Sequence, residues 1–547
     1  VGLEETKERL QQLVEVGALL AQKYDVVVTN PPYMGSGGMG AKLADFIKKE
    51  YPDTKSDLFA VFIEKGTGMV KHNAYNCMVT MQSWMFLSSF EKMRESIVLT
   101  KTITNLLHME NMVMGIAFGT AVTNFRNNHI TGYKGTYCHV KMSDIDNDEP
   151  RQFPVAGNRF AQVSTENFSK IPGMPIAYWV NNSIVESFSL GTNITKYVDT
   201  FQGIITGDND KFLRLWFEVN INRVAFGKSN MNDIDLAIQY WIPYNKGGEF
   251  RNWYGNHEYV INWEDGPEDK TRGKKTFQRF YLREYVSWSY ITSTTLASRY
   301  FPPGFLWDVH GSGIFDKTDM LFYLQALIGS KVGIELQKVI NSTLSYQVEN
   351  IAQLPVLIGE KETVDSLVKE NIEISTTDWN SFETSWNFAK HPLILWCDTG
   401  SISKTFLCWK DFTIKQFCKL HQNEERINNI FIETYKFRDV ISPEVAEKDI
   451  TIRRADLTRD IRSFLSYAVG CMFGRYSLDV DGLAYAGGEW DAGKYSSFIP
   501  DTDNILPITD EEYFEDDIVG RFVEFVKQVY GPDTLEENLD FIANALG

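Results

Sequence analysis

Cysteine is scarce in this sequence of 547 residues, and long apolar segments are missing from it. The six cysteines form no Cys-x-x-Cys pair, which favours a reducing, cytoplasmic location over a disulfide-bonded secreted protein. Cys408, Cys418 and His421 lie near one another, but their spacing fits no common zinc pattern, so we expect no metal site. We find no apolar run long enough to cross a bilayer and no signal peptide, and we therefore expect no membrane partner.

Two glycine-rich segments lack the residues of a phosphate-binding loop. Walker spacing from Gly35 requires lysine at position 41, where Ala41 stands, so we expect residues 35–40 to form a mobile loop. Residues 488–494 match the spacing, but Tyr495 occupies the position of the Ser or Thr that would hold magnesium. The sequence therefore predicts no Walker site for a nucleoside triphosphate.

The net charge of −18 is unevenly distributed along the chain. Residues 501–547 hold thirteen acidic and two basic residues, so the remaining 500 residues carry only about −7. Basic faces suited to nucleic acid are therefore compatible with the acidic total. We expect the acidic tail to be a solvated helical face, with docking of a partner or mimicry of DNA as alternatives.

The length and the pattern of hydrophobic residues predict several domains, because 547 residues exceed a single core. Residues 1–195 alternate strand and helix, which predicts an α/β domain with part of a doubly wound sheet. Residues 196–358 combine aromatic strands with two helices, as expected of an α+β domain, and residues 359–547 are mainly helical by pattern. In the last domain, helices are expected at 361–371, 378–388, 410–435 and 450–469.

The elements of the first domain can be placed more closely. Helices are expected at residues 3–23, from a cap at Ser56 or Asp57 to Met69, and at 88–99. Strands are expected at 25–28, 77–82, 102–109 and 115–126.

The segment Asp-Val-Val-Val-Thr-Asn-Pro-Pro-Tyr, residues 25–33, is the most informative stretch of the chain. Its three valines predict a short buried strand, which ends at Asn30 because Pro31 and Pro32 cannot continue it. The turn would lie at the carboxyl end of a strand, where open α/β sheets bind ligands. A plain strand-ending turn is the alternative.

The residue types of this turn suit chemistry on an amine. The side-chain oxygen of Asn30 and the carbonyl of Pro31 can each accept a hydrogen from an exocyclic amino group, which frees the nitrogen lone pair for attack. Tyr33 can stack on a base that has swung out of the duplex. The four residues resemble the Asn-Pro-Pro-Tyr motif of DNA methyltransferases that modify the amino group of adenine. In such enzymes a residue near the last strand helps to hold the base; Phe118 is a candidate, and core packing is its alternative role.

The cofactor side of such an enzyme has no counterpart that we can identify in the sequence. These enzymes bind S-adenosylmethionine on an aromatic-x-Gly-x-Gly turn that follows a strand. We find no such turn before Asn30, and only 29 residues precede it. We therefore expect the cofactor-binding half to lie outside this chain, and we name no cofactor-binding residue.

Basic residues interleaved with aromatic ones mark the second domain as a candidate DNA-binding region. Six positive charges fall within residues 270–283, among Phe277, Phe280 and Tyr281. Basic side chains neutralise phosphates, and arginine can read base edges, although a solvated face is the alternative. The candidate DNA-binding residues are Lys246, Arg251, Lys270, Arg272, Lys274, Lys275, Arg279 and Arg283.

Four blocks of sequence together resemble one family, the adenine-specific DNA methyltransferases of bacteriophage-exclusion (BREX) defence systems, the PglX family. The blocks are residues 30–33, 207–219, 244–256 and 471–488. The resemblance implies a cytoplasmic enzyme that uses S-adenosylmethionine to methylate adenine N6 in double-stranded DNA, with residues 196–358 as its target recognition domain. It also implies other phage-defence proteins as partners.

Two other functions stay open at this point. The chain could be a non-catalytic DNA-recognition module or scaffold for phage defence, because the cofactor half is not identified. It could also belong to a methyltransferase fused to a nuclease, although we see no metal-carboxylate nuclease cluster in the sequence.

Overall fold

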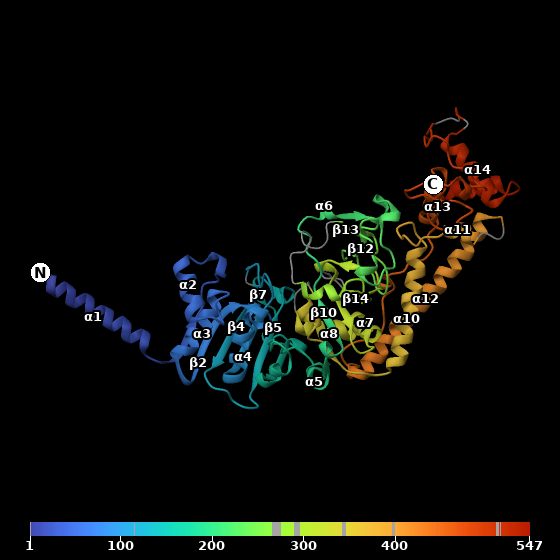
Figure 1. Cartoon of the computed structure of the whole chain (residues 1–547). Helices are drawn as coiled ribbons and strands as arrows, with labels where there is room; N and C mark the ends of the chain where they lie inside the picture. The colour runs from blue at the N-terminus through green and yellow to red at the C-terminus, as the bar shows by residue number, and fades with distance from the viewer. Residues whose placement is uncertain are drawn as a thin grey trace. The chain divides into compact units, whose positions relative to one another are not determined.

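The computed structural model (Figure 1) describes residues 2–113, 115–264, 275–288, 296–341, 346–396, 400–509, 513–514 and 516–547. The chain forms two compact units. The first consists of residues 1–192, 335–343 and 353–357, and the second of residues 193–334, 344–352 and 358–547. Within the described part of the chain, no helix is both long and apolar enough to span a membrane.

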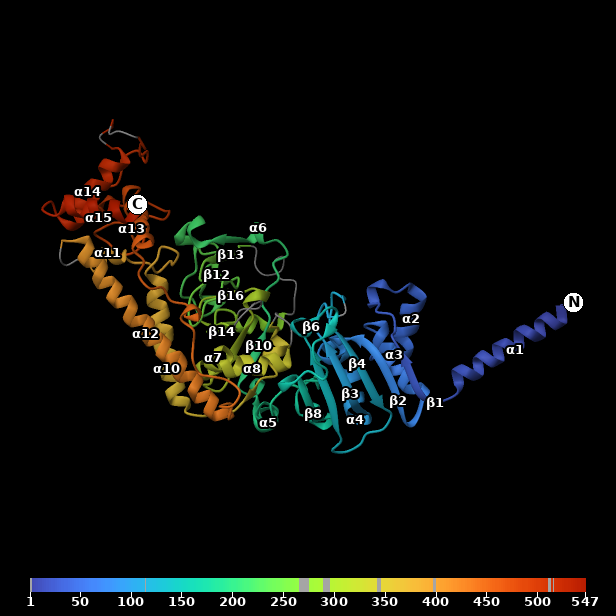
Figure 2. The same ribbon diagram turned by 180° about the vertical axis from the view of Figure 1, so that it is seen from behind.

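A six-stranded mixed sheet forms the centre of the first unit (Figure 2). Its order is β1 (Tyr24–Thr29), β2 (Val70–Met81), β4 (Thr120–Arg126), β3 (Thr102–Met109), β5 (Lys134–Val140) and β8 (Phe160–Ser164). Strand β1 pairs parallel to β2, and β3 pairs parallel to β5, whereas β4 runs antiparallel to both of its neighbours. The strands β1, β2, β3 and β5 therefore all end at the same edge of the sheet.

The helices of this unit largely follow the sequence predictions. They are α1 (Gly2–Ala21), α2 (Ala41–Glu50), α3 (Leu58–Met69), α4 (Glu91–Thr100) and α5 (Asn182–Leu190). The predicted cap is confirmed, because the carboxylate of Asp57 accepts a hydrogen bond from the backbone N–H of Phe59. The sequence did not predict helix α2, which follows the glycine-rich segment. Residues 36–38 form a 3₁₀ turn, and Gly40 directly precedes the helix.

Helix α3 packs closely on β2 through two side-chain features. Asn76 is fully buried, and its amide nitrogen donates to the carbonyl of Ile63 at 3.1 Å and to the hydroxyl of Thr67 at 3.0 Å. At Gly66 an added Cβ would lie 2.5 Å from the end of the Met78 side chain. The lack of a side chain at Gly66 therefore lets the helix lie close to the strand, and a larger residue would displace the flexible end of Met78 and press on the Asn76 amide.

The predicted burial of β1 is wrong. Val26 is 52% exposed and Val28 is 71% exposed, whereas Val27 packs against the core that includes Phe59 and Met78. Among the described residues, β1 is an edge strand of the sheet, and α1 has no buried residue. One face of β1 is consequently open, and the valine run alone did not reveal which face is covered.

Two four-stranded sheets form the first part of the second unit. One has the order β10 (Val198–Phe201), β17 (Gly313–Asp316), β14 (Tyr285–Trp288), β15 (Ser298–Phe301). The other has the order β11 (Leu213–Leu215), β13 (Tyr259–Asn262), β12 (Trp241–Asn245), β16 (Leu306–Trp307). Large aromatic side chains from both sheets share one core, in which Tyr285 stacks on Phe301 at 5.0 Å and on Phe315 at 5.2 Å.

Helices dominate the rest of the second unit. The longer ones are α7 (Leu321–Gly329), α10 (Lys361–Asn380), α12 (Ile402–Tyr435), α13 (Leu457–Met472), α14 (Ile518–Tyr530) and α15 (Leu535–Leu546). Two short helices are α9 (Val348–Ile351) and α11 (Pro392–Leu395), and residues of α8 (Lys331–Ile340) belong to both units. The predicted break at residues 372–377 is wrong, since α10 runs unbroken to Asn380. The acidic tail forms helices with a solvated acidic face, as expected: Glu524, Glu536 and Asp540 are exposed, while α14 and α15 bury apolar residues such as Phe525 and Ile542 against α13.

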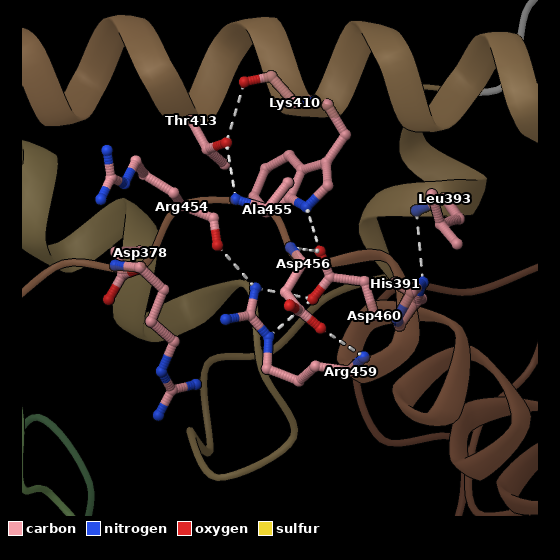
Figure 3. Close-up of polar contacts among 12 residues, drawn as sticks. Asp378, His391, Leu393, Lys410, Thr413, Arg454, Ala455, Asp456, Arg459 and Asp460 are labelled. Carbon is pink, nitrogen blue, oxygen red and sulfur yellow. Dashed lines mark hydrogen bonds and ion pairs between the residues drawn. The ribbon is translucent and has the colours of Figure 1, made fainter. Parts of the chain in front are cut away.

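The start of α13 is fixed to α12 by a buried polar network (Figure 3). The indole N–H of Trp409 donates to the carboxylate of Asp460 at 3.1 Å, and the Arg459 guanidinium contacts the same carboxylate at 2.7 Å. The backbone N–H of Ala455 donates to the Thr413 hydroxyl at 3.0 Å. Burial raises the pKa of Asp460, and the charge of Arg459 opposes that shift. The predicted class, a mixed α/β sheet followed by an α+β region and a mainly helical C-terminal part, is confirmed.

Candidate active site

Asn30, Pro31, Pro32 and Tyr33 follow β1 directly, at the sheet edge where the parallel strands end. Asn30 and Pro32 are exposed, Pro31 is buried, and Tyr33 is partly buried. Prolines 31 and 32 stop the strand because they lack a backbone N–H. The motif therefore presents an exposed amide beside a fixed carbonyl and an aromatic ring.

The hydroxyl of Tyr33 connects the motif to the sheet. It lies 3.0 Å from the side-chain oxygen of Asn30 and 3.1 Å from the backbone carbonyl oxygen of Val79 in β2. The ring makes edge-type contacts with Phe59 at 6.1 Å and with Phe118 at 5.7 Å. Burial raises the pKa of Tyr33, so the hydroxyl stays protonated and acts as a donor.

The segment after Tyr33 is tied to the start of α3. The backbone N–H of Met34 donates to the Asp57 carboxylate at 3.0 Å, and the N–H of Leu58 donates to the carbonyl of Met34 at 3.0 Å. Asp57 thus holds the motif as well as capping the helix. The sequence pattern predicted only the capping role, because nothing local indicates which chain segment lies against a helix start.

The arrangement supplies two acceptors of the kind that an amino group needs. An amide oxygen has two lone pairs, so the Asn30 oxygen can accept from an incoming N–H while it accepts from Tyr33. The Pro31 carbonyl comes from a residue with a restricted φ, which limits its reorientation. These positions agree with the predicted roles of Asn30 and Pro31, which stay predictions. Phe118 lies against Tyr33, where it can serve either of its two predicted roles.

The sequence identified no turn for S-adenosylmethionine before Asn30, and that expectation stays a prediction. Before Asn30 the described residues form only α1, without a buried residue, and β1. In this part of the described chain no glycine-rich turn joins a strand to a helix. We therefore assign no residue to the cofactor.

The structure describes only some of the basic residues that the sequence predicts to bind DNA. Lys270, Arg272 and Lys274 lie outside the described residues. Lys275 begins a 3₁₀ helix, Lys275–Phe280. Arg279 and Arg283 are exposed, and their guanidinium carbons lie 4.8 Å and 5.9 Å from the centre of the Phe280 ring.

Lys246 and Arg251 are engaged within the second unit. The ammonium of Lys246 lies 2.6 Å from the Asp308 carboxylate. The Arg251 guanidinium is buried, pairs with the Asp378 carboxylate at 2.6 Å, and lies 5.0 Å from the ring centre of Trp379 in α10. Because the charge of Arg251 is compensated inside the fold, we do not include this residue among the DNA contacts that we propose.

Comparisons with known proteins match one family model to the N-terminal part of the chain and two curated proteins to nearly all of it. Residues 3–113 match the family model of the Eco57I restriction-modification methylase. The adenine-specific methyltransferase PglX of Lacticaseibacillus casei (strain Zhang) is 38% identical over 572 residues, which cover 98% of this chain and 47% of that protein. The adenine-specific methyltransferase BrxX of Escherichia coli O9:H4 (strain HS) is 37% identical over 580 residues, which cover 99% of this chain and 46% of that protein.

The chain thus spans about half the length of the curated relatives that it matches. Among solved structures, the type IIL restriction-modification enzyme MmeI in complex with DNA aligns with 76% of this chain and 55% of its own. That alignment has 12% sequence identity and a TM-score of 0.44.

Proposed function

The chain belongs to the family of the adenine-specific methyltransferases PglX and BrxX, and on that premise we propose that it carries the acceptor side of a DNA methyltransferase. The reaction is transfer of a methyl group from S-adenosylmethionine to the N6 amino group of adenine in double-stranded DNA. The single observation that carries this proposal is the placement of Asn30 and Pro31 at the carboxyl edge of the sheet, beside the hydroxyl of Tyr33.

The residues of the motif each have a part in this proposal. The amino nitrogen of adenine is a weak nucleophile because its lone pair is delocalised into the ring. Hydrogen bonds from the amino group to the Asn30 oxygen and the Pro31 carbonyl hold both hydrogens away from the ring plane, so the lone pair can point at the donor. S-adenosylmethionine supplies an electrophilic methyl group when it is bound. Tyr33 offers its ring as a stacking surface for a base that has left the duplex.

We further propose that the complete enzyme acts in the cytoplasm with other proteins of a phage-exclusion system. The family relationship supports this proposal. Arg279 and Arg283 are the described candidates for contact with the DNA backbone, since both are exposed and neither is among the described ion pairs.

The decisive experiment is Asn30→Ala in the complete enzyme, with transfer of labelled methyl groups to DNA as the readout. Loss of one preorganised polar contact at a reacting centre costs roughly 100- to 1,000-fold in rate. DNA affinity should stay unchanged. Asn167→Ala removes a partly exposed amide of the same unit, which contacts only Lys170 among the described side-chain hydrogen bonds, and should leave the rate unchanged. Methylation that survives Asn30→Ala would contradict the assignment.

A DNA-recognition module without catalysis is the second candidate, and the exposed pair of Arg279 and Arg283 favours it. Calorimetric titration of this chain with S-adenosylmethionine tests whether the chain binds the cofactor by itself. The Asn30→Ala assay in the complete enzyme distinguishes the two functions. Affinity for DNA that falls steeply with salt, together with methylation that survives Asn30→Ala, favours the recognition role.

A further inference from the structure

A cavity lies at the same edge of the sheet as the candidate active site. Its volume is about 480 Å³, and its walls include Gln82, Glu110 and Lys141. Each of these residues directly follows a strand, namely β2, β3 and β5. Open α/β sheets bind ligands outside the carboxyl ends of their parallel strands, so the cavity occupies a binding position that the candidate active site does not use.

Aromatic rings line this cavity. Trp179 is 40% exposed and makes an edge-type contact with Phe86 at 5.6 Å. His108 and His139 stack with their ring centres 4.5 Å apart and an angle of 7° between the planes. Burial lowers the pKa of both histidines, that of His108 to about 3, so the stacked pair is uncharged at neutral pH. The cavity therefore offers flat, neutral surfaces.

The polar groups of the wall are fixed in orientation. One ring nitrogen of His108 contacts the side-chain oxygen of Gln82, and the other lies 3.1 Å from the hydroxyl of Tyr178. Since an amide oxygen only accepts, the imidazole carries its hydrogen on Nε2, and Tyr178 donates to Nδ1. The amide nitrogen of Gln82 then has two hydrogens to offer, and the described hydrogen bonds use neither of them.

Lys141 is the available cation at this cavity. Arg159 also lines it, but its guanidinium pairs with the Asp144 carboxylate. One oxygen of Glu110 accepts from the backbone N–H of Met142 at 3.1 Å. Among the described ion pairs none involves Lys141, so its ammonium can meet an anionic ligand.

We propose that this cavity binds a single unpaired nucleotide, with its base against Trp179, the base edge at Gln82 and a phosphate at Lys141. A nucleobase needs a flat aromatic partner and in-plane hydrogen bonds, and a phosphate needs a cation; the three residues supply these groups. The volume suits a small organic ligand, since such pockets span roughly 300–1,000 Å³. The nucleotide can come from two sources, a free mononucleotide or an extrahelical nucleotide of DNA. This site is separate from Asn30 and does not depend on methyl transfer.

The first test is calorimetric titration of the full chain with adenosine monophosphate and with adenosine. Trp179→Ala should weaken the binding of both ligands roughly 5- to 150-fold, the range of a lost base–aromatic stack. Trp179→Phe should restore most of the affinity. Lys141→Gln should weaken adenosine monophosphate roughly 2- to 5-fold and leave adenosine unchanged. Tyr75→Ala removes an exposed aromatic ring from β2 outside the cavity and should change neither affinity.

The second test separates the two sources of the nucleotide. A duplex with one bulged 2-aminopurine is compared with the fully paired duplex, and fluorescence reports the environment of the bulged base. Tighter binding of the bulged duplex that Trp179→Ala abolishes assigns the site to DNA. Binding of the mononucleotide without that preference assigns it to a free nucleotide. The proposal is overturned if neither adenosine monophosphate nor the bulged duplex binds. It is also overturned if Trp179→Ala and Lys141→Gln both bind adenosine monophosphate as tightly as the unaltered chain does. Asn30→Ala leaves this cavity intact, so failure here is distinct from failure of the proposed methylation.

Discussion

The hydroxyl of Tyr33 lies 3.0 Å from the side-chain oxygen of Asn30, so the aromatic residue of the motif directly holds its amide. The same hydroxyl lies 3.1 Å from the carbonyl of Val79 in the neighbouring strand. A hydroxyl has one hydrogen, and it can donate to either oxygen but not fully to both. The orientation of the Asn30 amide is therefore linked to the backbone of β2 through a single side chain.

Tyr33→Phe tests this link because it keeps the ring and removes only the hydroxyl. A typical hydrogen bond contributes about 1 kcal/mol, so we expect methyl transfer by the complete enzyme to fall about fivefold with unchanged DNA affinity. Tyr33→Ala, which also removes the stacking surface, should cost more. Equal rates for Tyr33→Phe and the unaltered enzyme would show that the hydroxyl does not hold Asn30 during the reaction.

Asp57→Ala should affect both stability and activity, since Asp57 caps α3 and accepts from the backbone N–H of Met34. Loss of a helix cap costs about 1 kcal/mol of unfolding free energy. Asp517→Ala removes the cap of α14 and is the matched control, with a similar loss of stability and no loss of methylation. Urea unfolding and methyl transfer are measured on both variants. Equal methylation by the two variants would exclude a role of Asp57 in holding the motif.

Arg279→Ala and Arg283→Ala should each weaken DNA binding and make it less dependent on salt. Removal of one phosphate contact lowers the slope of log affinity against log salt concentration by about 1. Arg438→Ala is the control, because Arg438 is exposed and pairs with Glu433 at the end of α12. Titrations of duplex DNA at several salt concentrations measure the slope. An unchanged slope in both variants would assign these arginines to a solvated face.

Glu424 should make the stability of the second unit depend on pH. Burial raises its pKa from 4.5 to about 7, and a hydrogen bond from the indole of Trp253 at 2.7 Å opposes the shift. The neighbouring Asp449 adds to the rise. Because the folded form retains a proton that the unfolded form has already lost, this group makes the protein less stable as pH rises from about 4.5 to 7.

The loss from Glu424 alone should be on the order of 3 kcal/mol and should level off above neutral pH. Glu424→Gln keeps an acceptor for Trp253 and removes the titration. The difference in unfolding free energy between about pH 5 and about pH 8 should therefore shrink in this variant. These two values lie on either side of most of the titration of Glu424. Chemical denaturation at the two pH values measures this difference, and an unchanged difference would contradict the raised pKa.

The motif and its strand could be predicted from sequence because their signals are local. Two prolines stop β1, and Asp57 stands directly before the apolar run of α3. The strand Thr102–Met109 was predicted with the bounds that the structure shows. Local composition also indicated a helical C-terminal region.

Long-range relationships could not be predicted in this way. The insertion of β4 between β2 and β3 depends on pairing between distant segments. Arg251 looked like a DNA contact among aromatic and basic residues, yet its partner Asp378 lies 127 positions away. The exposure of Val28 and the cavity formed by Gln82, Glu110 and Lys141 likewise depend on which elements meet in space.

Helix α12 is a rigid spacer between two anchoring points. Glu424 joins it to Trp253, in the β-sheet part of the second unit, and Trp409 joins it to Asp460 at the start of α13. At 1.5 Å per residue the two anchors are about 22 Å apart along an unbroken helix. Any protein that docks on α14 or α15, which pack on α13, is therefore held at a set distance from the β-sheets of this unit.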